Sequence, residues 1–372
     1  MLPDDFFSNL EHHLRSNLPF VAYRKPNDSS VNAILQNTNT LFSTQNFTES
    51  GFVFSPFSDS HKTVLIPLAE SKMRSCTLKI KASNNKYQSR VEGIDHNKDQ
   101  HLNLVQKGID AIKNRQFQKV VLSRCETINL AENQFISVFQ RLLQTYSTAF
   151  VYCWFHPKVG LWLGATPEIL LSVTGLRFKT MALAGTQALK DSLNVNWETK
   201  EREEQAFVTN YIETKLKPYV NGLKISEPKT VKAGNLLHLQ SNISGTLNTD
   251  LQTILSHLHP TPAVCGLPVN ESKTFILKNE SYDREYYTGF LGELNLKETT
   301  SRNTNRRNVE NNAYSSIKTV SHLFVNLRCM QIDNNNQALI YVGGGITKDS
   351  NPEDEWQETV SKAETMKRVL LS

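Results

Sequence analysis

The feature that most constrains the fold of this chain is an unbroken alternation of strand-like and helical segments after residue 100. Apolar residues recur at helical spacing in the segments 102–112, 135–143 and 198–219. Runs rich in β-branched and other apolar residues, which favour strands, lie at 119–124, 149–155, 160–163, 170–173 and 177–183. The pattern of the first hundred residues predicts an opening helix followed by short strands. No linker or internal repeat interrupts the pattern, so we expect one large mixed α/β domain over residues 1–372.

The composition narrows the class of protein. The chain of 372 residues has a formal net charge of +5, which is small for its length. Its basic residues are scattered, so we expect no nucleic-acid partner, whereas a modest positive balance suits a small anionic substrate. Five cysteines without a CxxC pair favour a reducing compartment. With no apolar run of about 20 residues and no signal-peptide pattern, we expect a soluble cytoplasmic protein without a membrane partner.

The C-terminal stretch carries the first candidate site. An apolar run ends in Gly343-Gly344-Gly345, where we expect a bend whose backbone N–H groups can approach a bound anion. A helix is predicted from Pro352 onwards, and its spacing places Glu355, Glu358 and Lys362 on one face. Such a face could hold a metal ion and an anionic substrate together. A solvated charged face, with Glu358 and Lys362 as a weak ion pair, is the alternative.

A second pair of carboxylates has the same spacing. Glu201 and Glu204 lie three residues apart on the helix predicted to begin near Glu198. Two helices that each offer such a pair would form an oxygen-rich site suited to Mg²⁺. Acidic residues are also common at helix starts for electrostatic reasons alone, so the local pattern leaves both interpretations open.

Lys119 and Glu168 are candidates for acid–base chemistry. Lys119 lies in a strand that otherwise looks buried. To act as a base near neutral pH its pKa would have to fall from about 10.4 to about 7, a change of ~4 kcal/mol. The alternative is a lysine that keeps an edge strand soluble. Glu168 follows Pro167 in a bend after an apolar strand, and burial there could make it a general acid.

Three further segments carry polar groups at strand ends. The small-residue turn Ala184-Gly185-Thr186 suits the close approach of a ligand. His238 alternates with apolar neighbours and is either a core histidine or a ligand contact. Arg328 is a charge within a strand, so it requires an anionic partner, either a substrate carboxylate or a structural ion pair. The polar stretch 297–316 is predicted to be a mobile hairpin loop without catalytic residues.

These features occur together and in an order that resembles the chorismate-utilising enzymes, and within them isochorismate synthase. The matching stretches are KVVLSR (119–124), GATPEIL (164–170), MALAGT (181–186), EREEQAFVTNYI (201–212), LLHLQS (236–241), HPTPAVCG (259–266), YDREYYTG (282–289), LFVNLRC (323–329) and YVGGGITKDSNPEDEWQETVSK (341–362). They cover most of residues 115–365. Residues 1–100 match only in general character and are expected to belong to the same fold.

The resemblance implies extended antiparallel sheets flanked by helices, with a deep cleft that holds Mg²⁺ and chorismate. It implies that Glu204 and Glu358 bind the metal directly, while Glu201 and Glu355 act through water. It also implies that Lys119 is the general base and Glu168 the general acid. The residues that it places against the substrate are Ala184, Gly185, Thr186, His238, Arg328, Tyr341, Gly344, Gly345 and Lys362.

The implied reaction is the attack of water on C2 of chorismate with loss of the C4 hydroxyl, which gives isochorismate for menaquinone or siderophore synthesis. Salicylate synthase, which also eliminates pyruvate, is the alternative within the family. An inert chorismate-binding homologue is the alternative from another class, and the retained Lys119, Glu168 and four carboxylates argue against it. Anthranilate synthase is disfavoured by Lys119, and aminodeoxychorismate synthase by Ala184. We expect no amidotransferase subunit, and a monomer or a weak homodimer.

Overall fold

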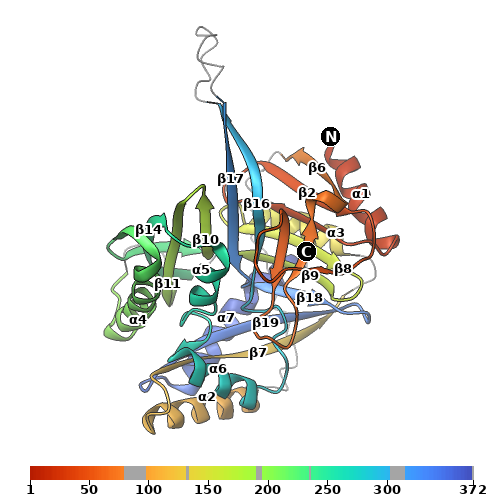
Figure 1. The fold of residues 1–372 in the computed structure, drawn as a ribbon. Helices are drawn as coiled ribbons and strands as arrows, with labels where there is room; N and C mark the ends of the chain where they lie inside the picture. The colour runs from red at the N-terminus through yellow and green to blue at the C-terminus, as the bar shows by residue number, and fades with distance from the viewer. Residues whose placement is uncertain (79–97, 131–133, 190–194, 234–235, 302–314, 371–372) are drawn as a thin grey trace.

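The computed structural model describes residues 1–78, 98–130, 134–189, 195–233, 236–301 and 315–370. Figure 1 shows two large sheets with helices on their outer faces and a long hairpin, β16 and β17, that projects from one end. Every strand pair in these ranges is antiparallel. The predicted class, extended antiparallel sheets flanked by helices, is therefore confirmed.

The first sheet joins strands from the two ends of the chain. Its order is β15 (Gly266–Leu267), β7 (Lys119–Asn129), β19 (Gln337–Ile346), β18 (Cys329–Ile332), β9 (Gly160–Thr166), β8 (Phe150–His156), β1 (Phe20–Arg24), β2 (Ser30–Gln36) and β6 (Ser71–Thr77). Three of the N-terminal strands, β1, β2 and β6, thus extend the same sheet that contains the C-terminal glycine run.

The second sheet carries the long hairpins. Its order is β12 (Val220–Ile225), β14 (Leu236–Leu247), β11 (Arg177–Ala188), β10 (Ile169–Thr174), β17 (Ser315–Val325), β16 (Phe290–Ser301), β4 (Gly51–Ser55), β5 (Val64–Pro67) and β3 (Phe42–Ser43), with β13 (Lys229–Ala233) on β14. The predicted strands 170–173 and 177–183 are β10 and β11, which pair with each other as a hairpin.

An aromatic core holds the two sheets together. Phe150 of β8 stacks on Phe324 of β17 with ring centroids 4.2 Å apart, and Phe54 of β4 lies 4.8 Å from Trp154 of β8. These residues are buried. Large rings remove much apolar surface from water, so the contact between the sheets is a main source of stability for the fold.

The helices cover the outer faces. The helices are α1 (Pro3–Arg15), α2 (Lys98–Lys113), α3 (Phe135–Thr145), α4 (Thr199–Leu216), α5 (Leu251–Leu258), α6 (Val269–Asn279) and α7 (Pro352–Leu370), with short 3-10 turns at Leu68–Glu70 and Lys217–Tyr219. Helices α1, α3 and α7 pack on the first sheet, and α4 and α5 on the second. No helix of the described ranges is long and apolar enough to cross a membrane.

Two expectations about local structure are wrong. Gly343, Gly344 and Gly345 do not form a bend but continue β19 in register with β7, opposite Ser123, Leu122 and Val121. The polar stretch 297–316 is not a loop throughout, because β16 extends to Ser301 and β17 begins at Ser315. Residues 302–314 lie outside the described ranges.

Candidate active site

A cleft between the two sheets brings most of the predicted site residues together. Including its open mouth, the cleft holds about 780 Å³ of unfilled space. The predicted residues that line it are Glu168, Ala184, Gly185, Thr186, Glu204, His238, Arg328, Tyr341, Gly344, Gly345, Glu358 and Lys362. They come from both sheets and from helices α4 and α7, so only the folded chain assembles the site.

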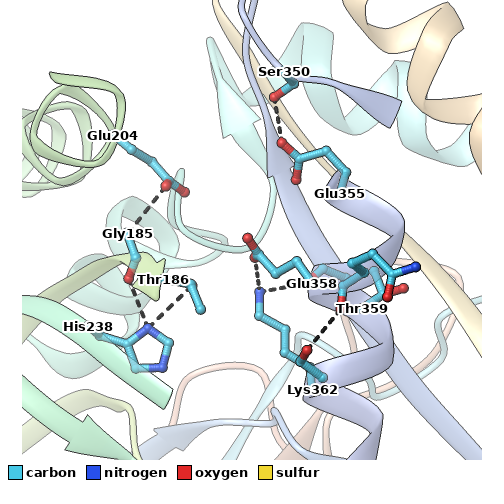
Figure 2. Close-up of polar contacts among 12 residues, drawn as sticks. Gly185, Thr186, Glu204, His238, Ser350, Glu355, Glu358, Thr359 and Lys362 are labelled. Atoms are coloured by element: carbon cyan, nitrogen blue, oxygen red, sulfur yellow. Dashed lines mark hydrogen bonds and ion pairs between the residues drawn. The ribbon is translucent and has the colours of Figure 1, made fainter. Parts of the chain in front are cut away.

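Helix α4 places Glu204 at one wall of the cleft. The helix packs on β11, where the pairing register with β14 shifts between Ala184 and Thr186. Gly185 at this bulge has φ +71°, and its N–H donates to Glu204 Oε2 at 3.2 Å (Figure 2). The positive φ explains the glycine, because residues with a Cβ rarely adopt it.

Glu201 differs from the other predicted carboxylates. Its side chain reaches back to the start of α4, where Oε2 accepts from the backbone N–H of Glu198 at 3.1 Å in a capping box. This contact satisfies an unpaired N–H of the first helical turn. The structure therefore does not bring the Glu201 carboxylate into the cleft, and its outer-shell role stays a prediction.

Helix α7 presents Glu355, Glu358 and Lys362 towards the same cleft (Figure 2). Asn351 caps the helix, as its side-chain oxygen accepts from the N–H of Glu353 at 2.9 Å. Glu355 is only 2% exposed, and its Oε1 accepts from the Ser350 hydroxyl at 2.6 Å. The predicted helix start and the shared face of the three side chains agree with the structure.

The glycines of β19 leave the space into which these carboxylates point. A Cβ on Gly344 would lie 3.1 Å from Glu355 Oε2 and 3.7 Å from Glu358 Oε1. A Cβ on Gly345 would lie only 2.5 Å from Glu204 Oε1. The strand backbone thus forms a floor on which carboxylates from both helices converge.

We expect Gly345→Ala to lower turnover by ~10-fold or more, since the new methyl group would displace the Glu204 carboxylate and press on Lys119 Cε at 3.0 Å. Gly344→Ala is the milder comparison, because its methyl group comes no nearer than 3.1 Å to a carboxylate oxygen, whereas that of Gly345→Ala overlaps Glu204 Oε1 at 2.5 Å. Steady-state kinetics of both variants, with circular dichroism to verify folding, check the prediction. Equal activity of both variants and the unaltered protein would contradict it.

Three lysines neutralise the three converging carboxylates. The distances from ammonium to carboxylate are 2.9 Å for Lys119–Glu204, 2.6 Å for Lys362–Glu358 and 2.9 Å for Lys200–Glu355. Burial raises the pKa of Glu204, but the ammonium groups of Lys119, Lys362 and Lys200 outweigh it, so the pKa lies below its usual value. Burial and the neighbouring Glu358 carboxylate raise the pKa of Glu355. The carboxylates thus require positive charge nearby.

The donor types in this set suit a hard divalent cation, although the three carboxylates do not all bring an oxygen within 4.8 Å of one another in this structure. Glu204 and Glu358 supply carboxylate oxygens from two helices, which is the ligand type that Mg²⁺ prefers. Glu355 Oε2 is buried without a hydrogen-bond partner in the described residues. An unsatisfied buried carboxylate oxygen is costly, so a cation or its water shell would stabilise it.

Lys119 does not lie at a sheet edge, so the edge-strand alternative is wrong. It pairs with Leu267 of β15, and β7 continues between β15 and β19. Its side chain is 0% exposed and reaches the floor of the cleft beside Gly345. Lys119 thus contacts a cleft carboxylate but is not among the residues that line the cleft, and its role as a base stays a prediction.

Glu168 is the buried acid of the cleft. It follows β9, whose Thr166 hydroxyl donates to the Val325 carbonyl at 2.6 Å and fixes the bend. Burial raises the pKa of Glu168 to about 8, although Lys119 and Arg328 act in the opposite direction. Glu168 is therefore mostly protonated at neutral pH, as a general acid must be.

His238 and Arg328 form a fixed pair. Arg328 donates to His238 Nε2 at 2.9 Å, so the proton of the neutral ring resides on Nδ1, which donates to the Gly185 carbonyl at 2.9 Å. Burial, with Arg328 and Lys362 nearby, lowers the pKa of His238 to about 3. The imidazole is thus neutral and accepts from Arg328. Figure 2 shows its other contact, with the Gly185 peptide that faces Glu204.

Several lining residues were not predicted. Ala263, Val264, Tyr287 and Thr288 line the cleft, together with Val121, Pro167, Leu183, Leu327, Val342 and Gly343. The first four lie in the motifs HPTPAVCG and YDREYYTG, which carried the resemblance without an assigned role. Their apolar surfaces and the Thr288 hydroxyl give no local chemical signal, so only the motif could have identified them.

Another acidic cluster lies on the β16–β17 hairpin. Glu293, Glu298 and His322 bring ligand-type atoms within 4.8 Å of one another. Lys25 lies 2.7 Å from Glu293 and 3.0 Å from Glu298, so an ammonium already fills the cluster. None of the three residues lines the cleft, so a metal ion held there would not contact a substrate bound in the cleft.

Solved structures of chorismate enzymes share the fold. A putative 2,3-dihydroxybenzoate-specific isochorismate synthase, DhbC, from Bacillus anthracis superposes with a TM-score of 0.76 at 21% identity, covering 98% of this chain and 99% of that chain. The menaquinone-specific isochorismate synthase MenF from Escherichia coli gives 0.73 at 21% identity, covering 95% and 89%. Anthranilate synthase component I from Streptococcus pneumoniae gives 0.61 at 15%, covering 93% and 89%.

Sequence relatives point in the same direction. Isochorismate synthase DhbC of Bacillus subtilis is 28% identical over 73% of this chain and 68% of its own length. Isochorismate synthase 2 of Arabidopsis thaliana is 30% identical over 72% of this chain, but the match spans only 46% of the plant protein. Family models described as chorismate binding enzyme match residues 47–301 and 314–368. The chain therefore belongs to the chorismate-binding enzyme family.

Proposed function

We propose that the protein is an isochorismate synthase, which converts chorismate to isochorismate with Mg²⁺. The observation that carries this proposal is the arrangement of Lys119 and protonated Glu168 around one cleft that also contains the converging carboxylates of α4 and α7. The names of the relatives support the same reaction. An inert binding protein would have no need for a buried lysine and a buried protonated acid.

The cleft offers cationic groups for the two carboxylates of chorismate. Arg328 and Lys362 line it, and Arg328 remains charged at neutral pH although burial lowers its pKa to about 10. Lys362 lies 2.8 Å from the Gly343 carbonyl, which fixes its ammonium at the strand floor. Bound Mg²⁺, held by Glu204 and Glu358, would neutralise and orient a substrate carboxylate.

Two side chains carry the proton transfers in the proposed reaction. Lys119, once its ammonium has given up a proton, removes a proton from the water whose oxygen forms a bond to C2 of the ring. The ring double bond shifts as the C4–O bond breaks, and Glu168 donates its proton to the departing hydroxyl, which leaves as water. One water enters and one leaves, so the reaction is an isomerisation.

The product test uses the purified protein with chorismate and Mg²⁺ alone. We expect a reversible mixture of chorismate and isochorismate with an equilibrium constant near one, because the entering water and the departing hydroxyl are chemically alike. Chromatography of the reaction over time measures both compounds. No ammonia or amidotransferase subunit is needed in this proposal.

The same experiment separates the alternatives. Salicylate and pyruvate that accumulate as fast as chorismate disappears would favour a salicylate synthase and overturn the proposed product. Chorismate that stays unchanged over hours while binding to the protein would favour an inert homologue. A reaction run with Mg²⁺ removed by EDTA is the control, and it should show no conversion.

A further inference from the structure

Lys200 links the two helices that carry the metal-site carboxylates, yet it has no part in the proposed reaction. It lies in the first turn of α4, and its ammonium is 2.9 Å from Glu355 Oε1 on α7. The Lys200 side chain is 36% exposed, whereas that of Glu355 is 2% exposed. Lys200 does not line the substrate cleft, so its partner is the carboxylate and not the substrate.

The Lys200 ammonium compensates the negative charge of the Glu355 carboxylate, which the fold buries. Glu355 Oε1 has Ser350 and Lys200 as partners, while Oε2 faces the Gly344 backbone without a hydrogen-bond partner in the described residues. Burial alone would lower the pKa of Lys200, but the Glu355 carboxylate outweighs it and raises the pKa. A buried carboxylate requires a cation, and Lys200 supplies one without any metal ion.

We propose that Lys200 is an internal counter-cation that a divalent metal ion replaces at Glu355. One part of this proposal rests on the proposed function, namely that the metal ion is divalent. A divalent ion among Glu204, Glu355 and Glu358 would repel a nearby ammonium, so the two cations compete for the same carboxylates. Lys119 and Lys362 pair with carboxylates that line the cleft, whereas the Lys200 side chain can move to a second place outside it.

That place is the neighbouring surface cavity. Lys200 lines it together with Glu203 of α4 and Asp349 of the loop before α7. These two exposed carboxylates can receive the ammonium when it leaves Glu355. The exchange requires only a change of side-chain rotamer, because Lys200 is partly exposed and has a flexible stem.

The test measures Mg²⁺ binding by isothermal titration calorimetry without chorismate. Lys200→Met should bind Mg²⁺ about tenfold more tightly than the unaltered protein, because one competing positive charge is gone. Lys348→Met is the matched control, since Lys348 lines the same cavity and its ion pair within the described ranges is with Asp349 at 4.0 Å. The control should change the affinity by less than about twofold.

Thermal unfolding gives a second readout. Without metal, Lys200→Met should melt at a lower temperature than the unaltered protein, because Glu355 loses its counter-ion; saturating Mg²⁺ should abolish most of this difference. In a Glu355→Gln background, Lys200→Met should no longer tighten Mg²⁺ binding. This double-mutant comparison isolates the Lys200–Glu355 pair from general changes in charge.

Unchanged or weaker Mg²⁺ binding by Lys200→Met would overturn the proposal, and so would the absence of Mg²⁺ binding in both proteins. The same tightening in the Glu355→Gln background would also overturn it, because the effect would not act through Glu355. A protein that follows the expected binding pattern but forms no isochorismate would leave the role of Lys200 intact and refute the proposed reaction alone.

Discussion

Glu358→Gln is expected to abolish Mg²⁺-dependent turnover, with a loss of ~10²-fold or more, while the protein remains folded. The substitution removes the negative charge of a carboxylate that converges with those of Glu204 and Glu355 on the β19 floor. Glu358 is partly exposed in the cleft and outside the apolar core, so the fold does not depend on its charge. Kinetics over a range of Mg²⁺ concentrations, with circular dichroism, check both parts.

The matched control is Glu353→Gln on the same helix. Glu353 is exposed and pairs with Lys98 at 2.7 Å on the surface, so its replacement removes the same charge without reaching the cleft. We expect this control to retain turnover within about twofold, because exposed ion pairs contribute little. Full activity of Glu358→Gln at low Mg²⁺ would refute the assignment of this glutamate as a metal ligand.

Local periodicity explains why the helix-borne part of the site could be predicted. A helix places residues three and four apart on one face, so Glu355, Glu358 and Lys362 were expected to lie together once Pro352 was taken as a helix start. The strands were predictable for a similar reason, since β-branched runs such as 119–124 favour extended backbone. These signals act within a few residues of sequence.

Contacts between distant segments carried no such signal. Lys200 and Glu355 are 155 residues apart in the sequence, and nothing near either of them indicates the pair. Glycine allows many conformations, so the sequence Gly343-Gly344-Gly345 alone does not distinguish a bend from a strand. Its real role depends on the register of β19 against β7 and on two helices above it. Glu201 was grouped with Glu204 by spacing, although its carboxylate caps α4.

Helix α6 was missed because its pattern is weak. Val269–Asn279 follows a proline-rich loop, and it buries only Ser272 and Ile276 completely, so its apolar periodicity is faint. The Ser272 hydroxyl donates to the Lys119 carbonyl at 2.9 Å, a contact that fixes the strand next to the proposed base. The single domain over 1–372 and the monomeric or weakly dimeric state stay predictions.

The assignment of Glu168 as the general acid predicts an effect of its substitution and an effect of pH on turnover. Glu168→Gln should lower turnover by ~10²-fold or more with a smaller change in substrate affinity, since the amide cannot give a proton to the departing hydroxyl.

Burial raises the pKa of Glu168 to about 8. The acid form is thus present below pH 8 and is lost as the pH rises through it, so the ratio of the turnover of the unaltered protein to that of Glu168→Gln should fall above that point. Glu227→Gln, an exposed acid, is the control and should keep this profile. A turnover ratio that stays constant from pH 7 to about 10, or near-normal turnover of Glu168→Gln, would place the general acid elsewhere in the cleft.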